Sequence, residues 1–371
     1  MKIICTRTKL LEAFQTAAAV APTRSPKEIL TNVKLEVSQE GAIVMGTDLE
    51  VGVRTKVDEV EIEAPGAAVL PIQRFGAILR ELPDEKIRIE ADPQGTRVKG
   101  ERSEFKLPGE NPDEFPAPTT FDEPVYHVLP ARFLKEVIRR TIFATDNESS
   151  RYALGGVLFE FEEHKLTAVG TDGRRLAKME GPATCVGEFK PNDQMTIIPV
   201  KALHLIERAI SDADAEVQIA ARSNDVLIKS SRVTIYARLV EGRFPKWRDV
   251  FPQRDTEITI ELPAGQFYSG VRQAAIVTSE ESRGIDFQFR DGTAVLAAVG
   301  AETGESHVEM PIAYDGDEVA IMLDPKFMSD FLRVLDPDKT FTLHLENSDR
   351  AAVCTTDDGY GYVIMPMARD R

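Results

Sequence analysis

The chain has 371 residues, 42% of them hydrophobic and 29% charged, and its formal net charge is -16. This length exceeds what one hydrophobic core supports, and no apolar run approaches the roughly 18 residues of a membrane span. The three cysteines, Cys5, Cys185 and Cys354, lie far apart without a CxxC pair, which argues against a disulfide framework or a zinc site.

The N-terminal sequence indicates the compartment. Residues 1–5 form an apolar run that is too short for a signal peptide, and Arg7 and Lys9 follow it at once. We therefore expect a cytoplasmic protein that has no membrane partner and needs no cofactor.

One sequence pattern occurs three times along the chain. Residues 32–48, which end in MGTD, return as residues 156–172, which end in VGTD, and again with more changes as residues 284–300. A second marker, at 70–79, 198–207 and 323–332, repeats in step, and both markers have a period of 124 to 130 residues. A period this long is a whole folding unit rather than a solenoid repeat. We predict three copies of one domain, at residues 1–120, 125–252 and 256–371.

Each copy is predicted to contain two helices on antiparallel sheet, an α+β fold. An opening strand leads into a helix at 8–20, 130–143 or 263–277, and alternating strands such as residues 33–38 follow. A second helix is predicted at 71–82, 199–211 and 324–334, started by Pro71, Pro199 or Pro325, because proline fits the first helical turn. Asp291 and Gly292 indicate a hairpin turn. The alternation of apolar and polar residues predicts sheets with one buried face.

The charges are sorted by predicted element. The six helices together carry a formal charge of +6, so the rest of the chain carries -22. A total of -16 argues against nucleic-acid binding by the surface as a whole, because duplex DNA repels an acidic protein. One explanation of the positive charge on the helices is that helices accept Lys and Arg readily. The other is an arranged positive field, which we favour because none of the six helices is net acidic.

Three spaced motifs resemble a known family. They are residues 170–177 (GTDGRRLA), 240–245 (VEGRFP) and 362–367 (YVIMPM), and Thr47-Asp48 and Arg24 with Ile29-Leu30 also fit. Together they resemble the bacterial DNA polymerase III beta subunit, the replicative sliding clamp, over the whole chain. The resemblance implies a non-catalytic processivity factor whose three clamp domains form a ring as a head-to-tail homodimer, with helices inside and sheets outside.

The resemblance also implies partners and a mechanism. The ring would encircle double-stranded DNA without reading its sequence, at the nucleoid in the cytoplasm. The replicative polymerase alpha subunit, the clamp loader, and other polymerases and repair proteins would bind through short linear motifs. On this reading the DNA-facing residues are Arg24, Arg74, Arg139, Arg140, Tyr152, Lys201 and Arg208.

The resemblance places a hydrophobic groove for partner peptides between the second and third domains. Its lining is Leu154, Thr171, Gly173, Arg174, Arg175, Leu176, Pro245, Val250, Val363, Ile364, Met365, Pro366 and Met367. Read physically, residues 363–367 form an apolar strand whose methionines offer a deformable surface for several ligands, or else simply the last core strand. Asp249 departs from the family, whose members often carry a basic residue there. The ring junction is expected to join Arg74, Ile78 and Phe105 to Ile276 and Val277 of a second chain.

Two other classes of protein remain as alternatives. In an enzyme, Asp48 and Asp172 would be catalytic or metal-binding carboxylates, but the third copy has Gly300-Ala-Glu there, and the five histidines are scattered. No Walker A or GxGxxG loop occurs. We therefore predict that both aspartates cap turns. A triplicated scaffold or surface protein is disfavoured by the positive helices and by the lack of a signal peptide.

Overall fold

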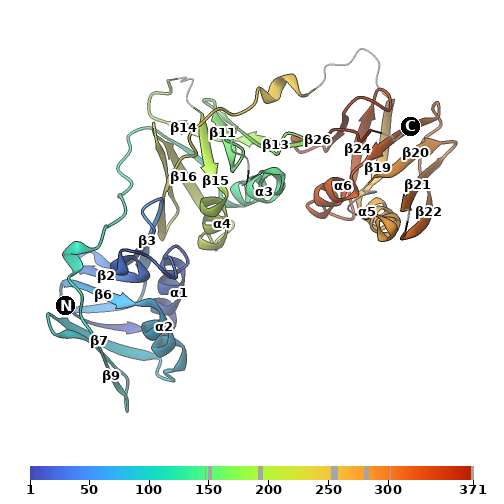
Figure 1. Cartoon of the computed structure of the whole chain (residues 1–371). Helices are drawn as coiled ribbons and strands as arrows, with labels where there is room; N and C mark the ends of the chain where they lie inside the picture. Colours follow the sequence, from blue (N-terminus) through green and yellow to red (C-terminus); the bar gives the residue numbers. More distant parts are fainter. Residues whose placement is uncertain are drawn as a thin grey trace. The chain divides into compact units, whose positions relative to one another are not determined.

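The computed structural model describes residues 1–146, 148, 153–190, 195–251, 258–279, 284–300 and 302–368. Contacts divide the chain into two compact units. The first unit contains Met1–Lys135 and Ala183–Leu239, and the second contains Glu136–Pro182 and Val240–Arg371. The central repeat contributes to both units, so each unit contains one junction between successive repeats (Figure 1).

The first unit begins with the whole N-terminal repeat. Its elements are β1 (Lys2–Thr6), α1 (Arg7–Ala18), η1 (Glu28–Thr31), β2 (Asn32–Ser38), β3 (Gly41–Thr47), β4 (Val51–Val57), β5 (Val60–Ala64), β6 (Gly66–Pro71), α2 (Ile72–Glu81), β7 (Lys86–Asp92), β8 (Gly95–Lys99), β9 (Glu104–Leu107) and η2 (Pro112–Glu114). From the central repeat come β10 (Tyr126–Pro130), β14 (Thr184–Val186), β15 (Thr196–Pro199), α4 (Val200–Ala209), β16 (Glu216–Ala221), β17 (Asp225–Lys229) and β18 (Val233–Arg238). Helix α3 (Ala131–Thr141) passes from this unit into the next.

The second unit completes the central repeat and contains the C-terminal one. Its elements are η3 (Ile142–Ala144), β11 (Gly156–Phe161), β12 (Lys165–Thr171), β13 (Arg175–Pro182), η4 (Trp247–Asp249), β19 (Ile258–Pro263), α5 (Ala264–Ala274), η5 (Ala275–Val277), β20 (Ile285–Arg290), β21 (Thr293–Gly300), β22 (Gly304–Pro311), β23 (Val319–Leu323), α6 (Pro325–Arg333), β24 (Thr340–Leu345), β25 (Ala352–Thr355) and β26 (Tyr360–Ile364).

Each unit contains a sheet that runs from one repeat into the next. In the first unit nine strands follow the order β14-β10-β16-β17-β18-β4-β3-β2-β6, and β18 pairs antiparallel with β4 across the repeat junction. In the second unit the order is β11-β12-β13-β26-β25-β24-β19, and β13 pairs antiparallel with β26 in the same way. The other sheets are β5-β1-β7-β8-β9 and β22-β21-β20-β23. The predicted α+β class with antiparallel sheets is confirmed.

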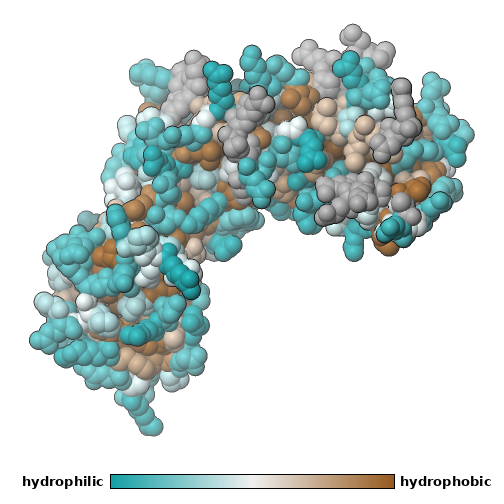
Figure 2. Space-filling model, viewed as in Figure 1, coloured by the Kyte–Doolittle hydropathy of each residue, from teal (hydrophilic) through white to brown (hydrophobic). Residues whose placement is uncertain are grey.

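The predicted helices are all present, and in the end repeats they pack as pairs. Helices α1 and α2 meet through Phe14 and Phe75, whose ring centroids are 5.3 Å apart. Helices α5 and α6 lie side by side (Figure 1), over a core in which Phe331 packs 5.3 Å from Phe341. Within the described residues no helix is long and apolar enough to cross a membrane. On the face in Figure 2 hydrophilic residues predominate, and hydrophobic residues appear in small patches between them.

The repeated glycine of the GTD marker has a packing cause. A Cβ atom at Gly46 would lie 2.1 Å from the carbonyl oxygen of Ala17, near the end of α1. At Gly170 it would lie 2.3 Å from the carbonyl oxygen of Thr141, at the end of α3. The first helix of each of these repeats crosses its strand so closely that only glycine fits. The predicted hairpin turn is also present, with φ of 41° at Asp291 and 74° at Gly292.

Candidate functional site

The two GTD markers end in the same kind of turn. The carboxylate of Asp48 accepts hydrogen bonds from the backbone N–H groups two and three residues ahead, at 3.0 and 2.7 Å. The carboxylate of Asp172 does the same, at 2.9 and 3.0 Å. The prediction that both aspartates cap turns is confirmed. Over the part of the chain that the structure describes, no group of three or more His, Cys, Asp or Glu residues could hold a metal ion.

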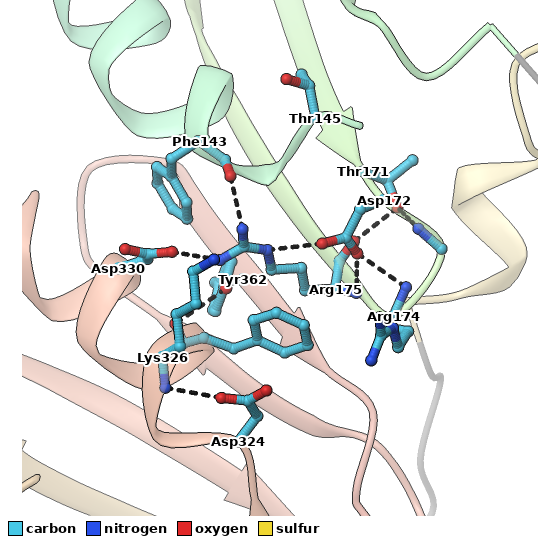
Figure 3. A network of polar contacts seen from close by, with 12 residues as sticks. Phe143, Thr145, Thr171, Asp172, Arg174, Arg175, Asp324, Lys326, Asp330 and Tyr362 are labelled. Carbon is cyan, nitrogen blue, oxygen red and sulfur yellow. Dashed lines mark hydrogen bonds and ion pairs between the residues drawn. The ribbon is translucent and has the colours of Figure 1, made fainter. Parts of the chain in front are cut away.

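Arg175 lies at the centre of a polar network beside the second turn (Figure 3). Its guanidinium donates to the Asp172 carboxylate at 2.9 Å and to the Asp330 carboxylate of α6 at 2.7 Å. A third hydrogen bond, of 2.7 Å, goes to the backbone carbonyl of Phe143. The guanidinium also lies over the ring of Phe327, 4.4 Å from its centroid. One side chain therefore connects the turn, the end of the first central helix and α6.

The environment of Arg175 keeps the guanidinium charged although the residue is buried. The residue is 7% exposed and Asp330 is 9% exposed. Burial would lower the pKa of Arg175, but Tyr362, Asp330 and Asp172 raise it on balance. Two carboxylates pair with this one guanidinium, because a buried charge is costly unless it is paired.

The C-terminal strand leaves the sheet beside this turn. In β26, Val363 pairs with Leu176 of β13, and both are 1% exposed. Two residues further on, the backbone N–H of Met365 donates to the carbonyl of Arg174 at 2.9 Å. The side chain of Met365 is 45% exposed. The apolar run is therefore core as far as Ile364 and surface from Met365 onward.

The residues predicted to line the groove all lie in the second unit. Buried ones are Leu154, Thr171, Arg175, Leu176, Val363 and Ile364. Half-buried or exposed ones are Gly173, Arg174, Pro245, Val250, Met365, Pro366 and Met367. The second set is accessible at the surface, whereas the first set is buried.

The segment before the third repeat packs against the same sheet. The ring of Phe251 lies about 3.0 Å from where a Cβ atom would project at Gly361 of β26. Trp247 packs edge-on against Phe251, with 6.2 Å between ring centroids, and its indole N–H donates to Glu160 at 3.3 Å. Val250, which is 38% exposed, directly precedes Phe251 in the chain. Asp249 is exposed beside it.

The residues predicted to face DNA have varied surroundings. Exposed ones are Arg24, Arg74, Arg139, Lys201 and Arg208, while Tyr152 lies outside the described residues. Lys201 forms an ion pair with Asp48, and Arg139 forms one with Glu136 at 2.7 Å. Arg208 lines a cavity of about 530 Å³ between α1 and α4, together with Lys9 and Lys56. These exposed cations can still exchange such surface pairs for phosphate, because exposed pairs are weak.

The prediction that Arg140 faces DNA needs correction. The residue is 7% exposed, and its guanidinium pairs with Asp358 at 2.8 Å and with Glu136. It also lies 4.9 Å from the ring centroid of Tyr360, whose hydroxyl donates to the Arg140 carbonyl at 2.9 Å. Arg140 therefore fastens α3 to the turn before β26. Its neighbour Arg139 is the exposed cation of this helix turn.

The Arg140–Asp358 contact predicts a pH-dependent stability. Burial would raise the pKa of Asp358, but hydrogen bonds from Arg140 and Thr356 and the charge of Arg140 lower it on balance below its ordinary 3.8. Because the folded pKa is the lower one, this stabilisation is present above about pH 4 and is lost as pH falls further. Asp358→Asn should lower the free energy of unfolding at pH 7 by about 1–3 kcal/mol, since the partly exposed carboxylate is screened by solvent.

Chemical denaturation at pH 7 and near pH 3 measures this effect. The difference between wild type and Asp358→Asn should shrink at the lower pH. The neighbouring exposed residue provides the control, Asp357→Asn, which should match wild type at both pH values. If the free energy of unfolding differs between Asp358→Asn and wild type by the same amount at both pH values, the ion pair is not the cause of the difference.

The expected ring-junction residues occur at opposite ends of the chain. In the first unit Arg74 is exposed, Phe105 is 38% exposed and Ile78 is buried. In the second unit Ile276 is 79% exposed and Val277 is half-buried. Among the residues that the structure describes, β9 and β22 are each the last strand at one edge of a sheet. Both edges are therefore free to pair with another chain.

Sequence reasoning missed the carboxylates that hold the two buried arginines. Asp330 follows Phe327 by three residues and precedes Phe331, so it falls on the apolar face of α6. Arg140 follows Val137 by three residues, on the buried face of α3. A charge on an apolar helix face has to be paired, and this signal was available in the sequence.

Comparison with known proteins gives matches over the whole chain. Family models described as the N-terminal, central and C-terminal domains of the DNA polymerase III beta subunit match residues 1–119, 128–246 and 248–368. The "Beta sliding clamp" of Pseudomonas putida is 30% identical over 372 residues, covering 97% of this chain and 98% of the relative. That of Chlamydia pneumoniae is 28% identical over 368 residues, covering 99% of each chain.

Solved structures agree with these relatives. The DNA polymerase sliding clamp of Bacillus subtilis superposes with a TM-score of 0.91 at 25% identity, and covers 100% of both chains. A sliding clamp of Pseudomonas aeruginosa bound to griselimycin gives 0.90 at 28% identity, again over 100% of both chains. Three matched domains in the right order, on a fold with the same repeats, show that this chain belongs to the DNA polymerase III beta subunit family.

Proposed function

We propose that this protein is a DNA sliding clamp, the processivity factor of chromosomal DNA replication. The observation that carries the proposal is the match of all three repeats to beta-subunit domains, with relatives named beta sliding clamp. The protein has no catalytic role in this function. It would act by enclosing duplex DNA in the cytoplasm, at the nucleoid, and by tethering other proteins to it.

The repeat itself supports closure into a ring. Within the chain, the strand that directly follows the GTD turn marker of one repeat pairs with the last strand of the next repeat, as β4 with β18 and β13 with β26. The equivalent strands left over are β22 and β9, which are edge strands. Pairing β22 with β9 of a second copy repeats the same head-to-tail junction, and two chains of three clamp domains (1–120, 125–252, 256–371) close a ring.

The charge distribution supports enclosure of DNA rather than tight binding. The six helices carry the net positive charge, while the whole chain carries -16. Exposed cations such as Arg24, Arg74, Arg139, Lys201 and Arg208 would meet phosphates without reading bases. Because affinity rises with each neutralised phosphate, a modest positive field allows the ring to slide, while the acidic remainder keeps it from binding bare DNA.

The apolar surface at Met365 supports a partner groove. Short motifs from the polymerase alpha subunit, the clamp loader, and other polymerases and repair proteins would place apolar anchors against Val250, Met365 and Met367. Unbranched methionines suit a surface that accepts several sequences. The buried residues Leu176 and Val363 would form the floor beneath these anchors.

Retention on DNA tests the function. The purified protein, loaded by a clamp loader on nicked circular DNA, should stay bound during gel filtration. Linearising the circle with a restriction enzyme should release it, because a ring held by topology slides off an end. Equal retention on circular and linear DNA would contradict enclosure and favour ordinary binding. Absence of retention on both would contradict the clamp function itself.

A further inference from the structure

The two GTD turns provide an internal comparison. In each, the threonine hydroxyl donates to the backbone carbonyl four residues ahead, at 2.9 Å from Thr47 and 2.6 Å from Thr171. In each, that hydroxyl also accepts from the N–H two residues ahead, at 2.9 and 3.1 Å. The backbones are equivalent, but the fifth residue is Val51 in one turn and Arg175 in the other. The second turn therefore has an added side chain with a separate role.

That added side chain ties the turn to α6. The guanidinium of Arg175 donates hydrogen bonds to Asp172, to Asp330 and to the Phe143 carbonyl. The other oxygen of the Asp330 carboxylate accepts a hydrogen bond from the exposed Arg333, at 2.8 Å. At 7% exposure, Arg175 offers almost nothing to a ligand directly. Its contacts determine where the turn lies relative to the third repeat.

The turn at residues 171–175 also fixes the position at which the exposed apolar surface begins. The carbonyl of Arg174, next to Arg175 in the chain, accepts from the N–H of Met365 at 2.9 Å. A second contact connects β26 directly to α6, because the Tyr362 hydroxyl donates to the Phe327 carbonyl of α6 at 3.0 Å. A continuous set of contacts therefore leads from Asp330 through Arg175 and Arg174 to Met365.

We propose that Asp330 is a positioning residue for partner-motif binding, acting through Arg175 on the turn whose Arg174 carbonyl binds the N–H of Met365. This inference rests on the proposed groove. Asp330 never touches the ligand. Its carboxylate holds the guanidinium in place, so that the turn and Met365 keep one arrangement in the free protein. A preorganised surface binds a linear motif better, because ordering need not occur on binding.

The test measures affinity for a peptide with Leu and Phe anchors by calorimetry. Asp330→Asn keeps an acceptor in place but removes its charge, and it should weaken binding about three- to thirtyfold. Arg175→Gln should weaken it similarly, and the double variant should lose no more than Arg175→Gln alone, because both act through one contact. Folding of each variant is checked by its thermal transition.

Two matched controls exist in the chain. Arg333→Gln removes the exposed partner of the same carboxylate, and Asp48→Asn alters the cap of the duplicate turn in the first unit. Both should bind the peptide as wild type does. The methyl NMR signals of Met365 and Met367 provide a second measurement. They should shift in Asp330→Asn and not in Asp48→Asn, even if both variants lose similar thermal stability.

The outcomes separate the inference from the groove on which it rests. If Asp330→Asn binds with wild-type affinity and leaves the Met365 signal unmoved, while Met365→Lys abolishes binding, the groove stands and the positioning role is wrong. If Met365→Lys binds as wild type does, the groove itself is misplaced. Additive losses in the double variant would also overturn the inference, because Asp330 would then act independently of Arg175.

Discussion

Replacing Ile276 with lysine is expected to convert the native protein from a dimer into a folded monomer. The Ile276 side chain is 79% exposed in the single chain, so the change leaves the core of the repeat untouched. In the proposed ring the same side chain is covered by the first repeat of a second copy, near Phe105 and the exposed Arg74. A buried lysine without a partner there costs several kcal/mol, and Arg74 would add repulsion.

Light scattering on a sizing column measures the change. Wild type should have twice the chain mass of 41.1 kDa, and Ile276→Lys should have that mass once. The control is Val125→Lys, which puts the same charge on an apolar side chain that is 40% exposed outside the proposed junction, and it should remain dimeric. If Ile276→Lys stays dimeric, the junction lies elsewhere. The monomer should also lose retention on nicked circular DNA, since an open chain encloses nothing.

Local patterns in the sequence predicted most of the fold. The spaced markers predicted three copies, and the helix positions followed from apolar periodicity and from Pro71, Pro199 and Pro325. The alternating strands predicted one-sided antiparallel sheets. What local patterns could not predict is how strands of different repeats pair, since β4 and β18 are far apart in the chain and only the folded structure brings them together.

The candidate site was predictable in outline and not in detail. The motifs identified the turn at Asp172 and the apolar strand end at Met365, which the structure joins through the Arg174 carbonyl. They did not distinguish exposed arginines from buried ones. Arg139 and Arg140 are neighbours on one helix, yet one is exposed and the other pairs with Asp358, more than two hundred residues away. Such a distant partner leaves no local signal apart from the charge on a buried helix face.

Replacing Met365 with lysine is expected to abolish binding of short hydrophobic motifs. Met365 is the first exposed residue after the core strand β26, and its side chain is 45% exposed. A linear motif gains most of its affinity by placing a few apolar anchors in a dry pocket, and loss of one such contact typically costs about 2 kcal/mol or more. The added ammonium would leave an anchor facing a charge that has lost its water. We therefore expect an affinity loss of at least about thirtyfold.

Calorimetric titration with a peptide that carries Leu and Phe anchors measures this loss. The variant should stay dimeric, because the proposed junction uses Ile276 and Phe105 and lies elsewhere in the chain. The control is Val186→Lys, a similar change at a side chain that is 39% exposed on β14 in the first unit, and it should bind as wild type does. Unchanged affinity in Met365→Lys would make the segment after β26 a passive continuation of the core strand and would require the partner site to be sought on another surface.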